Sequence, residues 1–224
     1  MKWLAALVAL LVPASAWAHP HIWISQHVRV ISENGRYVAF ELEWHFDPMS
    51  SEGEIPPIDE DGDGKISMQE IKSLADDMLP ELAKVGYQTW LNTGGKDFHP
   101  TAPPTLNARV DQPATFTPPD WDHEDGDDKD GKGDAGMPMP ENKRVTPPPK
   151  PEVPRNLVYV MRFPLAQPTK TLSIVTYDGE DFIRFEVDKA SLSTGCKLDK
   201  HPTYKSEFVP GKPVFADRVS CRLP

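Results

Sequence analysis

The strongest constraint on the fold is a strict alternation of apolar and polar residues in two neighbouring segments near the start of the chain. The apolar positions share one parity in each segment: Ile22, Ile24, Val28 and Val30 in residues 22–31, and Val38, Phe40, Leu42, Trp44 and Phe46 in residues 37–46. Because successive side chains of a strand point to opposite faces, both segments are predicted to be strands with one face in a core.

The turn between these strands decides which residues lie opposite each other. Residues 32–36 read Ser-Glu-Asn-Gly-Arg. A two-residue Asn-Gly loop would place core residues of one strand opposite surface residues of the other, whereas a three-residue loop with Gly35 in the left-handed conformation keeps the core faces together. We therefore predict the three-residue loop. Its register pairs His27 with Glu41, Trp23 with His45, and His21 with Asp47.

The second half of the chain is predicted to add further strands at hairpin spacing, namely residues 156–165, 170–178 and 181–187 and a last strand leading into residues 193–198. One helix is predicted over residues 67–85, where apolar residues recur at helical spacing, and Pro80 is expected to kink or split it. The expected fold class is mainly β: an antiparallel β-sandwich with a helical excursion between strands.

Residues 112–154 have a composition that cannot form a core. The region around them holds about half of the chain's 25 prolines, and it contains the acidic stretch DWDHEDGDDKDGKGDAG. We expect a disordered acidic and proline-rich insertion within a single β-rich domain, residues 19–224.

Residues 1–18 have the form of a secretory signal peptide. Lys2 precedes an apolar run over residues 3–12, and Ala16 and Ala18 give the small-x-small pattern of a cleavage site. The apolar run is too short to span a bilayer comfortably, so membrane insertion is not expected. The mature chain is expected to begin at His19 in the periplasm, and an uncleaved N-terminal helix is the alternative.

Charge and cysteine content narrow the function classes. The formal net charge is −10, and it becomes more negative when Lys2 is removed, which argues against nucleic acid as a partner. The two cysteines, Cys196 and Cys221, favour a disulfide in an exported chain, although two buried free thiols are the alternative.

Residues 59–70, DEDGDGKISMQE, resemble the calcium loop of EF-hand proteins. The six ligand positions are filled by Asp59, Asp61, Asp63, the carbonyl of Lys65, Ser67 and Glu70. Pro56 and Pro57 depart from the pattern because they interrupt the place of the entering helix. A structural calcium ion is therefore expected rather than a conformational switch, and an acidic turn that only caps the following helix is the alternative.

The histidine-rich start of the mature chain predicts a second metal site. The α-amine and imidazole of His19, with His21 and Asp47 and with His45 as an additional ligand, would suit zinc, nickel, cobalt or copper. Histidines that merely occupy an exposed strand edge are the alternative. His27 opposite Glu41 is interpreted as a surface pair.

Several stretches together resemble one family: AHPHIW at residues 18–23, Phe46-Asp47, DEDGDGKIS at residues 59–67, LSIVTYDGEDFIRFEV at residues 172–187 and GCKL at residues 195–198. They are similar to uncharacterised bacterial periplasmic proteins described as periplasmic components of ABC-type transport systems, often found with nickel, cobalt or zinc transporters. The resemblance implies a membrane metal transporter as partner.

Three functions follow from these features. The first is an exported metal-binding accessory protein, not an enzyme, that binds calcium at residues 59–70 and a transition metal at the histidine terminus. The second is a calcium-stabilised protein-interaction module without a transition-metal role. The third is a copper-dependent oxidase with a histidine-brace site at His19. No nucleophile–base pair or paired-carboxylate motif indicates a hydrolase.

Overall fold

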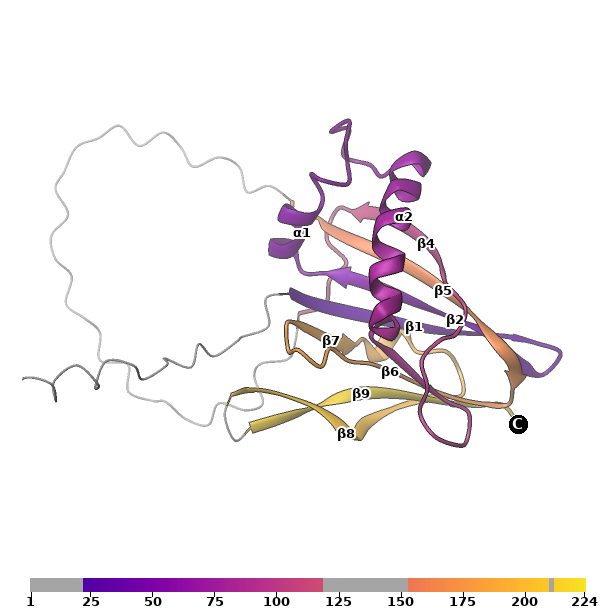
Figure 1. Ribbon diagram of the computed structural model, residues 1–224. Helices are drawn as coiled ribbons and strands as arrows, with labels where there is room; N and C mark the ends of the chain where they lie inside the picture. Colours follow the sequence, from indigo (N-terminus) through magenta and orange to yellow (C-terminus); the bar gives the residue numbers. More distant parts are fainter. Residues whose placement is uncertain (1–21, 119–152, 210–211) are drawn as a thin grey trace, which may run out of the picture.

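Two β-sheets that share one hydrophobic core make up the described part of the chain, residues 22–118, 153–209 and 212–224 of a computed structural model (Figure 1). The five-stranded sheet has the order β4 (Thr105–Asp111), β5 (Asn156–Thr169), β2 (Arg36–Phe46), β1 (Ile22–Glu33) and β7 (Ile183–Val187). The four-stranded sheet has the order β3 (Thr89–Asn92), β6 (Thr171–Thr176), β9 (Lys212–Arg222) and β8 (Cys196–Val209). Neighbouring strands are antiparallel except β1 and β7, so the predicted mainly β fold is confirmed.

The core lies between the two sheets and receives the even-numbered side chains of β1 and those of β2 from Phe40 onward, as the alternation predicts. At the start of β2, Tyr37 rather than Val38 belongs to the core, because the strand pairing shifts at this point. Ile24, Phe40 and Leu42 are at most 1% exposed. Leu172, Ile174 and Val219 of the four-stranded sheet belong to the same cluster of buried residues. The odd-numbered side chains of β1 up to Ile31 and of β2 from Ala39 to His45 therefore lie on the face of the five-stranded sheet that points away from this core.

The turn between β1 and β2 differs from the prediction. Glu33 pairs with Arg36, so the loop has only two residues, Asn34 and Gly35, and both have positive φ (50° and 69°). This conformation is the one that Asn-Gly favours in tight hairpins. The pairing then shifts between Ile31 and Ser32, and this bulge brings the two core faces back together.

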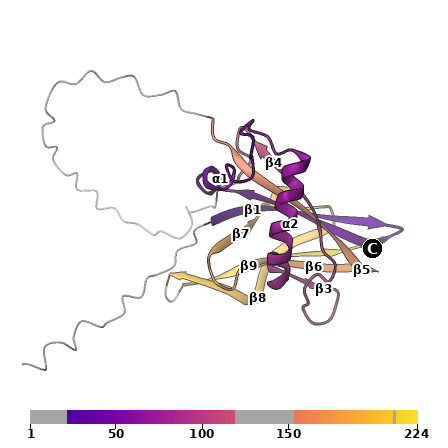
Figure 2. The same ribbon diagram turned by 45° about the horizontal axis from the view of Figure 1, so that its top comes forward.

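The helix predicted over residues 67–85 is present as α2 (Met68–Lys84), which crosses the strands in both views (Figures 1 and 2). Ser67 and Glu70 form a capping box at its start, each side chain accepting a hydrogen bond from the other residue's backbone N–H. Pro80 does not split α2: the helix is continuous from Met68 to Lys84, and the proline lies on its exposed side.

A seven-residue helix that was not predicted, α1 (Pro48–Glu54), follows β2. Asp47 is its N-cap, and its Oδ1 accepts the Ser50 N–H at 2.8 Å. The helix ends before Pro56 and Pro57, as expected for residues that precede prolines. Two short 3-10 helices, η1 (Gly86–Gln88) and η2 (Lys189–Ser191), complete the described elements.

The Cys196–Cys221 disulfide is confirmed, and it joins directly opposite residues of β8 and β9. The proposed signal peptide, residues 1–18, and residues 119–152 of the proposed insertion lie outside the described residues. The start of that insertion is attached to β5, because Thr115 N donates to Asn156 Oδ1 at 2.7 Å. Within the described ranges no helix is both long and apolar enough to cross a membrane.

Candidate metal centre

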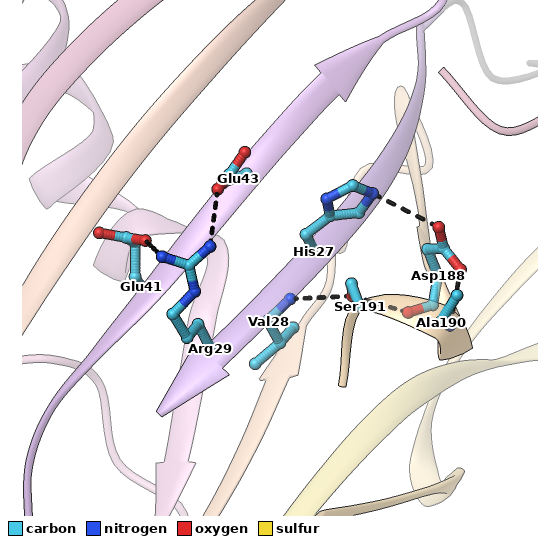
Figure 3. A pocket seen from close by; sticks show the side chains of 8 residues that line it. All are labelled: His27, Val28, Arg29, Glu41, Glu43, Asp188, Ala190 and Ser191. Atoms are coloured by element: carbon cyan, nitrogen blue, oxygen red, sulfur yellow. Dashed lines mark hydrogen bonds and ion pairs between the residues drawn. The ribbon is translucent and has the colours of Figure 1, made fainter. Parts of the chain in front are cut away.

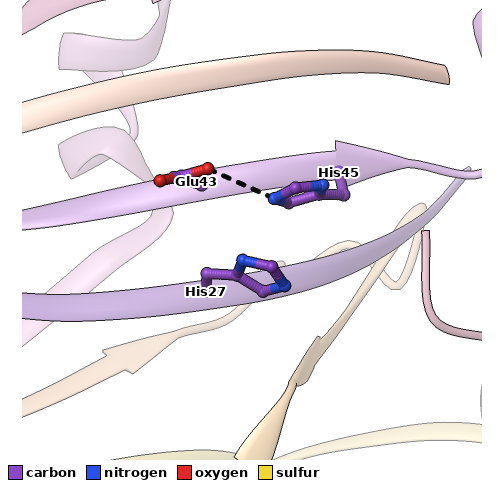
Figure 4. Close-up of side chains that lie close together, drawn as sticks. All are labelled: His27, Glu43 and His45. Atoms are coloured by element: carbon purple, nitrogen blue, oxygen red, sulfur yellow. Dashed lines mark ion pairs between the residues drawn. The ribbon is translucent and has the colours of Figure 1, made fainter. Parts of the chain in front are cut away.

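Three side chains that can bind a metal, His27, Glu43 and His45, meet on the face of the five-stranded sheet that points away from the core (Figure 4). His27 lies on β1 directly opposite Glu43 on β2, and His45 is two positions further along β2 on the same face. One ligand atom from each residue lies within 4.8 Å of the other two, and the imidazole centroids are 4.1 Å apart. The three donors are therefore close enough to share one ion.

His45 is the most buried member of this group, with 2% exposure. Its Nδ1 lies 2.7 Å from Thr115 Oγ1, and that hydroxyl donates to Asp111 Oδ2 at 2.7 Å. Because the single hydroxyl proton goes to the carboxylate, His45 Nδ1 must be the donor to Thr115. This assignment leaves His45 Nε2 with a lone pair and no proton when the ring is neutral.

The lone pair of His45 Nε2 faces another acceptor. Glu43 Oε2 lies 3.4 Å away, and within the described part of the chain Nε2 is a buried atom without a hydrogen-bond partner. Burial first, and then the neighbouring His27, lower the pKa of His45 to about 4. The ring is therefore neutral at neutral pH. His45 Nε2 and Glu43 Oε2 are then two unprotonated acceptors that face each other, and a cation bound between them would stabilise this arrangement.

A second carboxylate, that of Asp188, lies on the opposite side of the His27 ring. His27 Nε2 pairs with Asp188 Oδ2 at 3.4 Å, and Figure 3 shows Asp188 and Glu43 on different sides of the imidazole. With Nε2 directed at a carboxylate, Nδ1 is the nitrogen available to a metal shared with Glu43 and His45. Carboxylates commonly accept a hydrogen bond from the second nitrogen of a ligating histidine. Within the described residues His27 Nε2 is a buried atom without a hydrogen-bond partner, so Asp188 would have to move closer to take this role.

Glu43 completes the group with a carboxylate that is paired with guanidinium groups. Arg109 Nη2 donates to its Oε2 at 2.9 Å, and Arg29 Nη2 lies 3.6 Å from its Oε1. Burial alone would raise the pKa of Glu43, but the hydrogen bond and charge of Arg109, with smaller contributions from the two histidines, lower it. The carboxylate is therefore ionised and available as a ligand at neutral pH.

A pocket of about 280 Å³ adjoins this group and is lined by two of its members, but not by the buried His45. His27 and Glu43 form part of its wall, together with Arg29, Glu41 and Asp188 (Figure 3). Its three carboxylates outnumber the one arginine, so its charge favours cations. Two imidazoles and one carboxylate are a donor set that suits zinc and the neighbouring divalent transition metals.

The structure changes the ligand set expected from the sequence. His45 belongs to the site, whereas the Asp47 carboxylate caps α1 and also accepts the Trp23 N–H at 3.0 Å. His19 and His21 lie outside the described residues. The interpretation of His27 and Glu41 as a pair is wrong, because Glu41 faces Arg29, with Oε1 3.2 Å from Nη1. The predicted register paired His27 with a residue two positions away from its true partner, Glu43, so the sequence did not reveal His27 as a candidate ligand.

The predicted calcium loop brings three of its carboxylates together. Oxygens of Asp59, Asp61 and Asp63 lie within 4.8 Å of one another, and Asp59 Oδ2 accepts the Gly64 N–H at 2.9 Å. Gly64 has φ of 81°, the conformation that the sharp turn requires. Glu70 instead accepts backbone N–H bonds from Glu60 at 2.8 Å and Ser67 at 2.7 Å.

The comparisons with known proteins give one family. No curated protein and no solved structure matches the chain. Residues 4–209 match the model of a family described as protein of unknown function, DUF1007. Because this match covers nearly the whole sequence, including His27, Glu43 and His45, the chain belongs to the DUF1007 family.

Proposed function

We propose that this protein is an exported metal-binding accessory protein that holds a divalent transition metal between His27, Glu43 and His45. The observation that carries the proposal is the 3.4 Å approach of His45 Nε2 to Glu43 Oε2. Both atoms are acceptors in the protonation states that their surroundings favour, and Nε2 is buried. Glu43 Oε2 also accepts from Arg109, but the buried lone pair of His45 Nε2 has no donor among the residues that the structure describes, and a cation bound between the two atoms would supply what it lacks.

The arrangement suits binding and transfer better than permanent storage. Three protein ligands leave at least one coordination position of a tetrahedral ion open, and the adjoining pocket would give that position access to solvent. A donor group from another molecule could therefore reach the metal without unfolding the site. The proposed partner is a membrane metal transporter, as the family resemblance in the sequence implies. The proposed location is the periplasm. The disulfide is compatible with that oxidising compartment.

Calorimetric titration of the mature protein with zinc, nickel, cobalt and copper tests the proposal. We expect micromolar or tighter binding of zinc that His45→Ala and Glu43→Gln each weaken by about a hundredfold. Glu41→Gln is the matched control, because Glu41 lies on the same face of β2 but faces Arg29 rather than the histidines. Zinc binding that survives both ligand substitutions would refute the site.

A second proposed function is calcium binding at residues 59–70. The Asp59–Gly64 hydrogen bond and the clustering of Asp59, Asp61 and Asp63 support it, since both belong to the loop geometry in which these carboxylates surround one ion. Calcium would stabilise the segment between β2 and α2. The two sites use different donor sets, so each can be tested while the other stays intact.

A further inference from the structure

The two metal ligands of β2 are joined by a closed ring of polar contacts. Glu43 Oε2 accepts from Arg109 Nη2 at 2.9 Å, and Arg109 Nε donates to Asp111 Oδ1 at 2.9 Å. Asp111 Oδ2 accepts from Thr115, which in turn contacts His45 Nδ1. The ring closes where His45 Nε2 faces Glu43 Oε2.

Arg109 reaches this ring from a strand that is not paired with β2. It lies on β4, and β5 runs between β4 and β2. Its guanidinium therefore extends over β5 to reach Glu43. The oxygen it binds, Oε2, is the same oxygen that faces His45 Nε2. A metal ion on that oxygen would lie about 4–5 Å from the guanidinium, given ordinary hydrogen-bond and metal–ligand distances.

We propose that Arg109 is a resident cation that competes with the metal for Glu43, and that it thereby sets the affinity of the site low enough for the metal to be released. This inference rests on the function proposed above. In the metal-free protein Arg109 neutralises Glu43. When a divalent ion binds, the same guanidinium becomes a like charge at short range and lowers the affinity.

The contacts of Arg109 allow it to yield to the metal. Its side chain is 43% exposed, and its Nε is bound to Asp111, so it keeps one carboxylate partner when Glu43 turns to the ion. Arg29 also contacts Glu43, but its closest approach is 3.6 Å, its side chain is 65% exposed and Glu41 is its nearer partner. Solvent screening makes Arg29 a much weaker competitor.

Removing Arg109 changes metal affinity in opposite directions depending on whether Arg109 competes with the metal for Glu43 or orients Glu43 toward it. If Arg109 only held Glu43 in position for the metal, its removal would loosen the ligand and weaken binding. If Arg109 competes, its removal strengthens binding and slows release. The metal-free protein should at the same time become less stable, because the Glu43 carboxylate, 16% exposed, loses its counter-ion.

The experiment compares zinc binding by the full mature protein with that of Arg109→Gln, using Arg29→Gln as the matched control. We expect Arg109→Gln to bind zinc at least about tenfold more tightly and to release it to a chelator about tenfold more slowly. Arg29→Gln should change either quantity by less than about threefold. Equal or weaker zinc binding by Arg109→Gln would overturn the inference.

A second measurement on the unaltered protein does not depend on the variant folding. In the metal-free protein, the contact with Glu43 should slow rotation and hydrogen exchange of the Arg109 guanidinium in nuclear magnetic resonance spectra. Zinc should speed both, and unchanged signals at saturation would contradict competition.

If zinc binding does not require His45 and Glu43, the proposed function itself fails. If it requires them but Arg109→Gln does not bind more tightly, only the inference about Arg109 fails.

Discussion

His27 on β1 lies directly opposite Glu43 on β2. A three-residue turn would instead have placed Glu41, two residues earlier on β2, opposite His27. The two-residue Asn34-Gly35 turn and the bulge after Ile31 together produce the observed pairing. A shift of two residues leaves every side chain on its own face but exchanges every cross-strand neighbour. The candidate metal centre therefore depends on the bulge as much as on its three side chains.

Thr115→Val is expected to weaken zinc binding by about tenfold or more, because His45 Nδ1 loses the hydroxyl that fixes its tautomer. Thr115→Ser keeps the hydroxyl and should bind zinc like the unaltered protein. Isothermal calorimetry with zinc checks both. Equal affinity of the valine and serine variants would show that the hydroxyl has no part in orienting His45.

Substitutions of Asp47 should affect stability and leave zinc binding intact. Asp47→Ala removes the N-cap of α1 and the acceptor of the Trp23 N–H, which should cost about 1–2 kcal/mol in the free energy of unfolding. Asp47→Asn retains an N-cap oxygen and should cost less. Urea unfolding and zinc titration of both variants are the measurements. A tenfold loss of zinc affinity in Asp47→Asn would restore Asp47 as a ligand.

The metal-free protein is expected to lose stability as the pH falls from about 7 to about 5. The pKa of His45 is lowered to about 4 in the folded state from 6.5, so the unfolded chain binds more protons in this window and stability rises with pH. The contribution of His45 is about 2 kcal/mol over that interval.

Urea unfolding of the chelator-treated protein at about pH 7 and about pH 5 measures this change in the free energy of unfolding. Burial also lowers the pKa of His201, which adds a dependence of the same sign, so the comparison must be made with His45→Gln. That variant should show a flatter pH profile than the unaltered protein. Identical profiles would mean that His45 is not buried as a neutral ring.

Millimolar calcium should raise the melting temperature of the protein, and Glu70→Gln should reduce this rise. The change requires Glu70 to leave the backbone N–H groups of Glu60 and Ser67 and to bind the ion. Lys65→Ala is the control, because the expected ligand at that position is the main-chain carbonyl. A melting temperature that calcium does not change, or changes equally in Glu70→Gln, would contradict calcium binding at this loop.

Replacing both Cys196 and Cys221 by serine should lower the free energy of unfolding by about 3 kcal/mol, since the bridge closes a loop with a sequence separation of 25. Reduction of the unaltered protein should have a similar effect. Zinc affinity should be unchanged, because the bridge joins β8 and β9 of the four-stranded sheet and the metal centre lies on the other sheet. Thermal unfolding with and without a thiol reductant measures the difference.

Local patterns in the sequence predict much of the fold. The alternation in β1 and β2 is correct for the core face, and Ser67 and Glu70 mark the start of α2. The four-residue strand β3 and the second strand of the β8–β9 hairpin lack a strong apolar alternation, and they form because neighbouring strands supply their hydrogen-bond partners. Strand β4 alternates Leu106, Ala108 and Val110 with polar residues, a pattern typical of a strand, although it is absent from the strands expected above.

The candidate site is less predictable because its parts come from distant segments. The side chains around the three ligands include Arg109 from β4, Thr115 from a stretch whose composition predicts disorder, and Asp188 after β7. No sequence spacing connects them. The Asn34-Gly35 dipeptide is the one local signal for the correct register, since Asn-Gly favours a two-residue turn. A two-residue turn keeps the core faces together only if a bulge follows it, and no local sequence pattern marks that bulge.

The three ligands all lie in the single hairpin of β1 and β2, between residues 27 and 45, although the groups that surround them are scattered along the chain. Closing so short a loop costs little entropy, so this hairpin can form early during folding, before the distant strands dock. A metal that binds there would cross-link the two strands in their final register and suppress alternative pairings of the Asn-Gly turn. We therefore expect zinc to accelerate refolding as well as to stabilise the folded protein, so that metal supply would govern how fast newly synthesised chains reach the native state.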